Sequence, residues 1–113
     1  MKDLLVEIVI AIRNIVPENF EKVILYVTRF EGTVSFSGDY IDIDHKTHWI
    51  DFFNYSIDDG LFQQLYFETQ NNSLIHMNWN KAVFILTSDN KLDINYLWDQ
   101  ELQDNVDLYN KDS

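Results

Sequence analysis

Two pairs of alternating segments constrain the fold of this chain more than any other feature of its sequence. Residues 21–30, EKVILYVTRF, and residues 33–44, TVSFSGDYIDID, place β-branched and aromatic residues at near-alternate positions and are joined by a Glu-Gly dipeptide. Residues 81–87 and 92–97 repeat the pattern around a polar turn. Such alternation is typical of strands with one buried face, and turn residues between two such runs predict a hairpin. We therefore expect two hairpins in an antiparallel sheet.

A further strand is predicted between these hairpins. The segment WIDFF follows a turn at residues 45–48 and would place its even-numbered residues inward and its odd-numbered residues outward. Gly38 interrupts the strand before it, and a glycine inside a strand pattern often marks a bulge or a bend. Beyond Gly38, the alternation predicts that Tyr40 faces outward together with Asp42 and Asp44.

The residues before Pro17 have the spacing of an amphipathic helix, with apolar side chains three or four positions apart from Leu4 to Val16. Val6 and Ile10 widen this stripe, so we expect the helix to be covered broadly. Charged residues interrupt the run, which is shorter than the roughly 20 apolar residues of a membrane-spanning helix. We expect a core helix, and neither an export signal nor a membrane anchor.

A second helix is predicted from residue 56 to about residue 71. Ser56 precedes Asp59 by three residues, which is the spacing of a capping box, and an apolar stripe follows. The stripe consists of Leu61, Phe62, Leu65 and Tyr66. The pattern of residues 74–79 is ambiguous, and we expect His76 to lie in this connection without a chemical role.

The composition changes at Asp99, after which residues 99–113 are rich in acids and form either a short helix or a frayed acidic tail. Residues 1–98 can build one core, so we expect a single domain. The predicted fold class is α+β, with an antiparallel sheet of about five strands packed with the N-terminal helix and the second helix. The absence of cysteine fits a reducing compartment, and we expect a cytoplasmic protein.

The charge of the chain limits its function. The sequence has 19 acidic and 8 basic residues, a formal net charge of −11, which disfavours binding to a nucleic acid backbone. An acidic surface can instead be steered toward the cationic groove of another protein and occupy it. Solubility alone would also explain any single one of these acids.

Aromatic residues among the acids mark the surface that we expect to bind such a partner, because aromatic anchors with charged rims are typical of protein interfaces. The candidate binding residues are Asp39, Tyr40, Asp42, Asp44, Trp49, Asp51, Asp99 and Glu101. Trp98 lies beside the last two of them. For Trp79 and Trp98, a place in the core is equally compatible with the sequence.

The histidines leave an alternative open. His45 and His48, with Asp42 and Asp44 and with His76 further along the chain, could serve a small metal-dependent hydrolase. No regular metal-ligand spacing, nucleophile elbow or phosphate-binding glycine loop supports that alternative. We expect a binding protein and not an enzyme, without a cofactor or metal; a general protein-interaction module is a third interpretation.

Two stretches of the chain resemble a known family. They are IVPENFEKVILYVTRFEG, which begins at Ile15, and WNKAVFILTSDNKLDINY, which begins at Trp79. Together with the order of the predicted elements, they resemble the YezG-like immunity proteins over nearly the whole chain up to Trp98. The matching positions are Pro17, Glu18, Phe20, Tyr26, Trp79, Asp93, Tyr96 and Asp99. Asn90 stands where glycine is expected in the last turn of that family.

The resemblance implies a cytoplasmic antitoxin that neutralises the toxic domain, often a nuclease, of a polymorphic or contact-dependent secreted toxin. Such a protein protects the cell that produces the toxin, or its kin. Charge and resemblance together predict a cognate toxin domain, a basic nuclease, as the partner. We expect no direct contact with nucleic acid or with a membrane.

Overall fold

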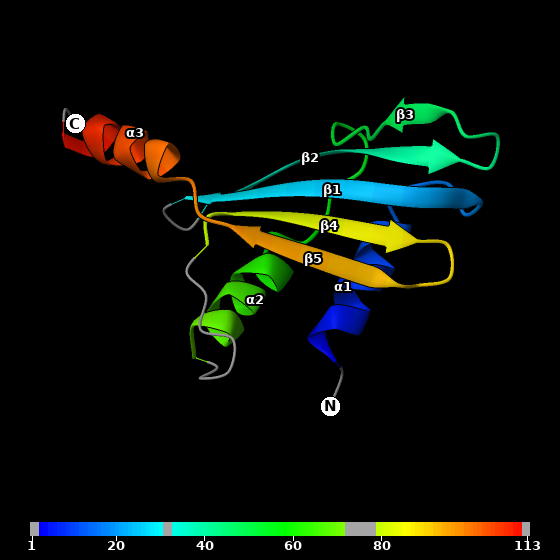
Figure 1. Cartoon of the computed structure of the whole chain (residues 1–113), viewed down its shortest axis with the longest axis horizontal. Helices are drawn as coiled ribbons and strands as arrows, with labels where there is room; N and C mark the ends of the chain where they lie inside the picture. The colour runs from blue at the N-terminus through cyan, green and yellow to red at the C-terminus, as the bar shows by residue number, and fades with distance from the viewer. Residues whose placement is uncertain (1–2, 31–32, 72–78, 112–113) are drawn as a thin grey trace.

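The described residues, 3–30, 33–71 and 79–111 of a computed structural model, form three helices and five strands (Figure 1). In chain order the elements are α1 (Leu4–Arg13), β1 (Phe20–Phe30), β2 (Thr33–Asp42), β3 (Thr47–Trp49), α2 (Asp59–Asn71), β4 (Lys81–Thr87), β5 (Leu92–Leu97) and α3 (Gln100–Lys111). The strands form one antiparallel sheet in the order β3-β2-β1-β4-β5. The predicted α+β fold is confirmed, as is the antiparallel pairing within both hairpins. The Glu-Gly link lies outside the described residues.

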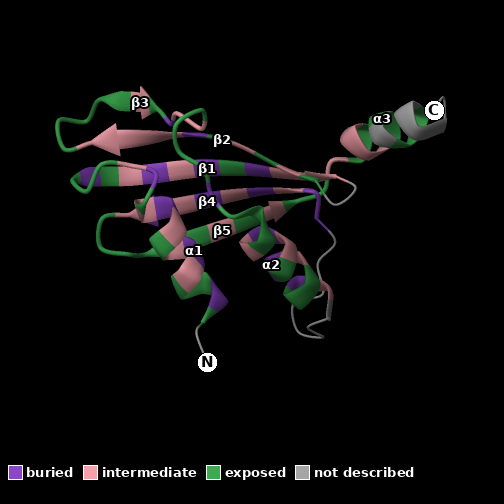
Figure 2. Cartoon of the chain, turned by 180° about the vertical axis from the view of Figure 1, so that it is seen from behind, coloured by how far each residue is buried: buried purple, intermediate pink, exposed green. Residues whose placement is uncertain are grey.

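One face of the sheet is buried because α1 and α2 both pack against it (Figure 2). Alternate residues of the central strands point into this layer and are almost fully buried. They are Val23, Leu25, Val27, Ala82, Phe84 and Leu86. Ile8 of α1 and Phe62 of α2 reach the same core, and the ring of Phe62 lies edge-on to that of Phe84 with 5.2 Å between their centroids. The sheet and both helices therefore share one core.

Helix α1 is covered on one side only. Asp3 caps its start by accepting a hydrogen bond from the Leu5 N–H at 2.9 Å. Ile8 is fully buried, whereas the side chains of Val6 and Ile10 are 53% and 54% exposed. The expectation of a broadly covered helix is wrong, because the sheet covers the side of α1 that carries Ile8 and leaves Val6 and Ile10 exposed.

Helix α2 begins at Asp59, and its cap is not the predicted one. The carboxylate of Asp58 accepts the Gly60 N–H at 2.9 Å, while Ser56 lies exposed in the preceding loop. The prediction of a Ser56 cap is wrong because Ile57 is buried in the core, so the helix starts only after that residue. The predicted apolar stripe is confirmed, since all its members belong to the core or pack against it.

Strand β3 is shorter than the predicted WIDFF strand, which is wrong beyond Trp49. The N–H of Ile50 still bonds to the carbonyl of Gly38 at 3.1 Å. The carboxylate of Asp51 then accepts the Phe53 N–H at 3.0 Å, which turns the chain out of the sheet. The predicted alternation holds nevertheless, since Ile50 is 1% and Phe53 97% exposed.

Gly38 marks a close approach of two strands and not a bulge. A Cβ atom at Gly38 would lie 2.4 Å from the carbonyl oxygen of Ile24 and 3.2 Å from the Cα atom of Leu25. The irregularity in the pairing of β1 with β2 lies instead between Phe20 and Lys22, at the other end of β2 from its start. A residue without a side chain is therefore required at Gly38 by packing.

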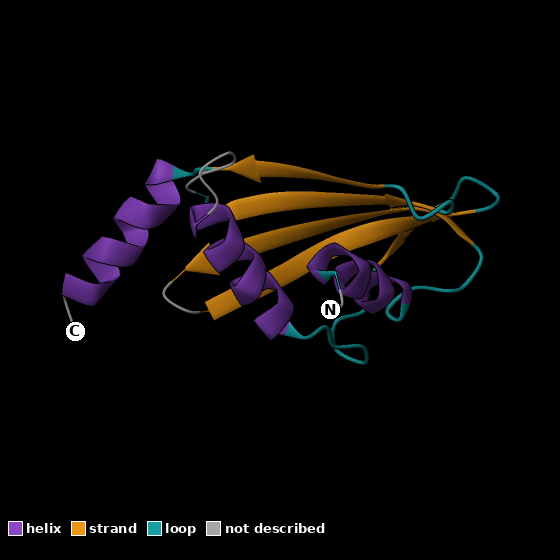
Figure 3. Cartoon of the chain, turned by 90° about the horizontal axis from the view of Figure 1, so that it is seen from below, coloured by secondary structure: helices purple, strands orange, loops and turns teal. Residues whose placement is uncertain are grey.

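Of the two alternatives for the C-terminal segment, the helix is the one observed. The Asp99 carboxylate caps α3 by accepting the Leu102 N–H at 3.0 Å, and it also accepts a hydrogen bond from Lys81 Nζ at 2.7 Å. The Asn80 side chain holds the main chain of Asp99 through two bonds of 2.8 and 2.7 Å. Beyond this anchor, α3 projects past the end of the sheet (Figure 3).

The tryptophans differ in their surroundings. Trp79 is 1% exposed and donates its indole N–H to Thr69 Oγ1 at 2.8 Å, so it is a core residue. Trp98 is 42% exposed and donates to the side-chain oxygen of Gln100. His76 and the rest of residues 72–78 lie outside the described part of the chain.

Candidate functional site

The second face of the sheet is not covered by any helix of the described residues. Figure 1 shows this side, opposite to the one on which α1 and α2 lie in Figure 2. Its residues alternate along the strands with the buried ones, and we call this surface the open face. It comprises Lys22, Ile24, Tyr26, Thr28, Phe30, Thr33, Ser35, Ser37, Asp39, Ile41, Thr47, Trp49, Lys81, Val83, Ile85, Thr87, Asp93, Asn95 and Leu97.

A row of paired residues crosses the open face from one edge of the sheet to the other. Trp49 pairs with Asp39, which pairs with Ile24. Ile24 in turn pairs with Ile85, and Ile85 pairs with Asp93. Directly paired residues place their side chains about 5 Å apart on the same face. The row therefore has an apolar middle with one carboxylate on each side, and it ends at a tryptophan.

Large side chains on the open face remain accessible to solvent. Trp49 is 68% exposed, Leu97 is 50% exposed and Tyr26 is 44% exposed. Tyr26 pairs with Val83, which extends the apolar middle by one further row. Exposed apolar residues gathered on one face and rimmed by polar ones are typical of a protein-binding surface. The open face has these features.

Tyr40 does not belong to the open face, and the expectation that it faces outward is wrong. It pairs with Val23, which is fully buried, so both side chains lie on the core side of the sheet. The Tyr40 ring packs partly against the core and stacks on the ring of His48 with 4.9 Å between their centroids. Strict alternation along β2 from Thr33 onward places the side chains of Phe36 and Tyr40 on the same face of the sheet, as observed.

A hollow at the β3 edge brings Tyr40 together with two other predicted residues. Its volume is about 220 Å³, and it is lined by Ile15, Val16, Pro17, Tyr40, Trp49, Asp51 and Tyr55. Trp49 therefore borders both the hollow and the open face. The Asp51 carboxylate, besides bonding to Phe53, accepts the side-chain amide of Asn54 at 2.6 Å.

The carboxylate of Asp42 organises the turn between β2 and β3. It accepts the N–H groups of Asp44 at 2.9 Å and Lys46 at 3.0 Å, and it lies 2.6 Å from His48 Nε2. The hydrogen bond with His48, followed by that from the Lys46 N–H, lowers the pKa of Asp42 from its ordinary value of 3.8. Asp42 thus has a structural role in this turn, whereas Asp44 is exposed at its tip.

The two histidines of the alternative metal site contact different carboxylates. His45 Nδ1 lies 2.7 Å from Glu21 Oε2, and His48 Nε2 lies 2.6 Å from Asp42 Oδ2. His45 has a φ of 65°, so it occupies the left-handed position of the turn. Across residues 3–30, 33–71 and 79–111, no group of three or more histidine or carboxylate side chains is arranged to hold a metal ion.

The last two predicted binding residues lie at the start of α3, apart from Asp39 and Trp49. The hydrogen bond from Lys81, followed by that from the Leu102 N–H, lowers the pKa of Asp99 from 3.8. Glu101 is exposed in the first turn of α3. The structure therefore divides the predicted residues among the open face, the hollow with its neighbouring turn, and the base of α3.

The apolar middle of the open face was not among the predicted binding residues. Its members are Ile24, Tyr26, Val83 and Ile85. The sequence carried a signal for it, because apolar residues occupy both alternating sets of residues 23–27 and 82–86. A strand that is apolar on both faces of a sheet with helices on one face leaves an apolar surface uncovered.

Comparison with protein-family models finds none that matches the chain, and comparison with curated proteins finds no matching relative. None of the described helices combines the length and the apolar content needed to cross a membrane.

Proposed function

We propose that this chain is an immunity protein that binds and neutralises the toxic domain of a polymorphic or contact-dependent secreted toxin, with the open face as its binding surface. The observation that carries the proposal is the row from Trp49 to Asp93, an uncovered apolar strip between two carboxylates. The resemblance of the sequence to YezG-like immunity proteins supports it. We further propose that the protein acts in the cytoplasm.

The charge of the chain indicates which toxin domain it would bind. A net charge of −11 steers a basic protein toward the surface and can raise association rates about 10-fold to 1,000-fold at low salt. Nucleases that act on a phosphate backbone present cationic grooves. We therefore propose a basic nuclease domain as the partner, inhibited because the acidic protein occupies or covers its substrate groove.

The open face offers anchors as well as charge. The main chain of Trp49 and Tyr26 is already fixed by strand pairing, so only side-chain freedom is lost when a partner covers these aromatic residues. Asp39 and Asp93 lie at the margins, where exposed charges set orientation and association rate more than affinity. A rigid sheet with this arrangement suits a partner whose apolar centre is surrounded by lysine and arginine.

The function is tested by coexpression with the toxin domain encoded in the neighbouring reading frame. We expect the wild-type chain to restore growth and to copurify with the toxin domain. The double variant Asp39→Lys/Trp49→Ala should lose rescue and bind about 100-fold more weakly, because it removes one anchor and reverses one charge.

A matched control changes one aromatic and one acidic residue on the side of the helices. Phe67 and Glu68 are exposed on α2, so Phe67→Ala with Glu68→Lys alters charge and aromatic content equally. This control variant should rescue growth as well as the wild type. Equal loss in both double variants would remove the open face from the proposal, and failure of the wild-type chain to rescue growth would refute the function.

A further inference from the structure

Strand β5 is an edge of the sheet, and no strand of the described residues pairs with its outer side. The N–H of Thr87 bonds to the carbonyl of Lys91 at 3.0 Å, which fixes the phase of the hairpin ladder. Because hydrogen-bonded pairs alternate along antiparallel strands, the main-chain groups of Leu92 and Ile94 point away from β4. The sequence of β5, LDINYL, contains neither proline nor lysine, the residues that commonly protect an edge from pairing.

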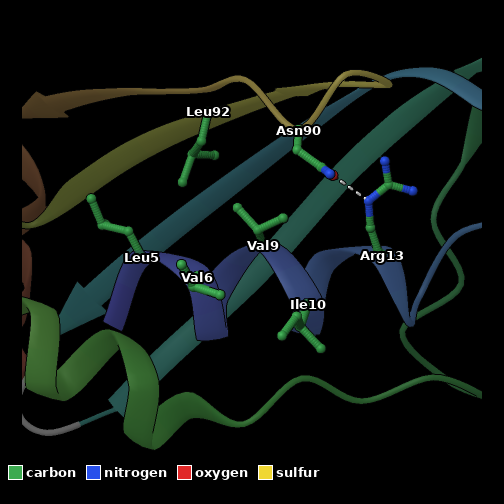
Figure 4. A pocket seen from close by; sticks show the side chains of 7 residues that line it. All are labelled: Leu5, Val6, Val9, Ile10, Arg13, Asn90 and Leu92. Carbon is green, nitrogen blue, oxygen red and sulfur yellow. Dashed lines mark hydrogen bonds between the residues drawn. The ribbon is translucent and has the colours of Figure 1, made fainter. Parts of the chain in front are cut away.

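An apolar groove runs beside this edge, between α1 and the start of β5 (Figure 4). Its volume is about 400 Å³, and it is lined by Leu5, Val6, Val9, Ile10, Arg13, Asn90 and Leu92. Three of these side chains, those of Leu5, Val6 and Ile10, are 42%, 53% and 54% exposed. The groove and the edge strand therefore adjoin, and Leu92 belongs to both.

The turn end of the groove is closed by a fixed side chain. Arg13 Nε donates to Asn90 Oδ1 at 2.6 Å (Figure 4). Its Nη2 donates to the Ser88 carbonyl at 2.8 Å. The guanidinium also lies 4.9 Å from the centre of the Phe20 ring. These contacts hold α1 against the hairpin, so the groove is formed before any ligand arrives.

We propose that an extended segment of a basic partner protein adds to the sheet at β5, with its inward side chains in the α1 groove. An added strand would bond to the outward groups of Leu92 and Ile94, as in other cases of strand addition. Every second side chain would then contact the groove and should be apolar. The intervening side chains would lie beside Asp93 on the open-face side and should be basic.

Charge distinguishes this occupant from a second copy of the chain. Two copies would each bring a net charge of −11. Pairing of β5 with itself would also place both Asp93 residues on one side of a shared sheet, where like charges repel. A basic segment instead gains from the same field. The inference does not require the partner to be a toxin, so its failure would leave the proposal for the open face standing.

The test uses a synthetic peptide of about eight residues that alternates valine with lysine. We expect it to slow amide hydrogen exchange of Leu92 and Ile94 by at least about 10-fold at saturation, and to shift the methyl resonances of Val6 and Ile10. A peptide that alternates valine with glutamate should not do so. A lysine peptide whose backbone amides are N-methylated along one edge should also give no protection, because it cannot form the added hydrogen-bond ladder with β5.

Protein variants separate the edge from the groove. Ile94→Pro removes an outward N–H that β4 does not use, whereas Ile94→Ala removes only side-chain packing. We expect the proline variant to lose binding and the alanine variant to keep it. Val6→Ser/Ile10→Ser changes exposed positions only, so it should fold and bind about 10-fold more weakly.

Three results would overturn the inference. The first is unchanged exchange at Leu92 and Ile94 with about 1 mM lysine peptide. The second is equal protection by the glutamate or N-methylated peptide. The third is protection that grows with protein concentration in the absence of peptide, which would identify a second copy as the occupant.

Discussion

Replacing Gly38 with alanine should destabilise the sheet where β2 comes closest to β1. The added Cβ would meet the Ile24 carbonyl oxygen at 2.4 Å, the Leu25 Cα atom at 3.2 Å and the Ile50 Cδ1 atom at 3.2 Å. Two of these atoms belong to the backbone of β1, which is paired on both sides and cannot move alone. Overpacking costs about 1–3 kcal/mol, and a separation of 2.4 Å from a backbone atom places this substitution at the upper end of that range. Restricting the unfolded chain offsets about 0.4–1 kcal/mol, so we expect a net loss of about 2 kcal/mol.

Urea unfolding measures this loss. With a slope of about 2 kcal/mol per molar urea, the midpoint of the Gly38→Ala variant should fall by about 1 M. Ser37→Ala is the matched control, because Ser37 is the exposed neighbour on the open face, and its free energy of unfolding should stay within about 0.5 kcal/mol of wild type. Equal midpoints for the two variants would refute the close approach of the strands at Gly38.

Three further substitutions test other parts of the structure. Trp79→Phe removes the indole bond to Thr69 from a fully buried site and should lower the free energy of unfolding by about 2 kcal/mol. A loss below about 0.5 kcal/mol in urea unfolding would contradict the place of Trp79 in the core. The pKa of Asp42 is lowered in the folded chain, so its bond with His48 contributes stability above pH 3.8 that is lost as the pH falls through the folded pKa. The urea midpoint of the wild type should therefore fall in that pH range, and the midpoint of Asp42→Asn should fall less. An equal fall in both proteins would count against the bond. Asn90 has a φ of 67°, so Asn90→Ala should be about 1 kcal/mol less stable than Asn90→Gly in thermal unfolding, and equal stabilities would argue against that backbone conformation.

Much of the fold could be predicted because its strands and helices have clear periods. Alternation predicts both hairpins, and three-to-four spacing predicts α1 and α2. The errors lie where tertiary contacts override local signals. Ser56 has the spacing of a cap, but burial of Ile57 delays the helix to Asp59. Gly38 has the pattern of a bulge, but the approach of β1 explains it.

The candidate site was predicted only in part because the sequence does not state which face of each strand the helices cover. Asp39 and Tyr40 were both chosen as binding residues although adjacent strand residues lie on opposite faces, and pairing with Val23 puts Tyr40 on the core side. Asp42 was chosen for its charge, but turn geometry gives its carboxylate three partners within the chain. The sequence shows that residues 23–27 and 82–86 are apolar at both alternating sets, but the pairing of β1 with β4 that joins them into one apolar middle depends on a long-range register that no local pattern encodes.

Radical footprinting of aromatic side chains tests the proposed binding surface most directly. The purified chain is labelled alone and in complex with the cognate toxin domain, and oxidation is measured residue by residue. Tyr26 and Trp49 are 44% and 68% exposed in the free chain, and Phe67 on α2 is 61% exposed, so all three should be labelled in the absence of the partner. We expect the complex to protect Tyr26 and Trp49 and to leave Phe67 unchanged. Protection of Phe67 with undiminished labelling of Tyr26 and Trp49, or no complex at all, would contradict a function carried by the open face.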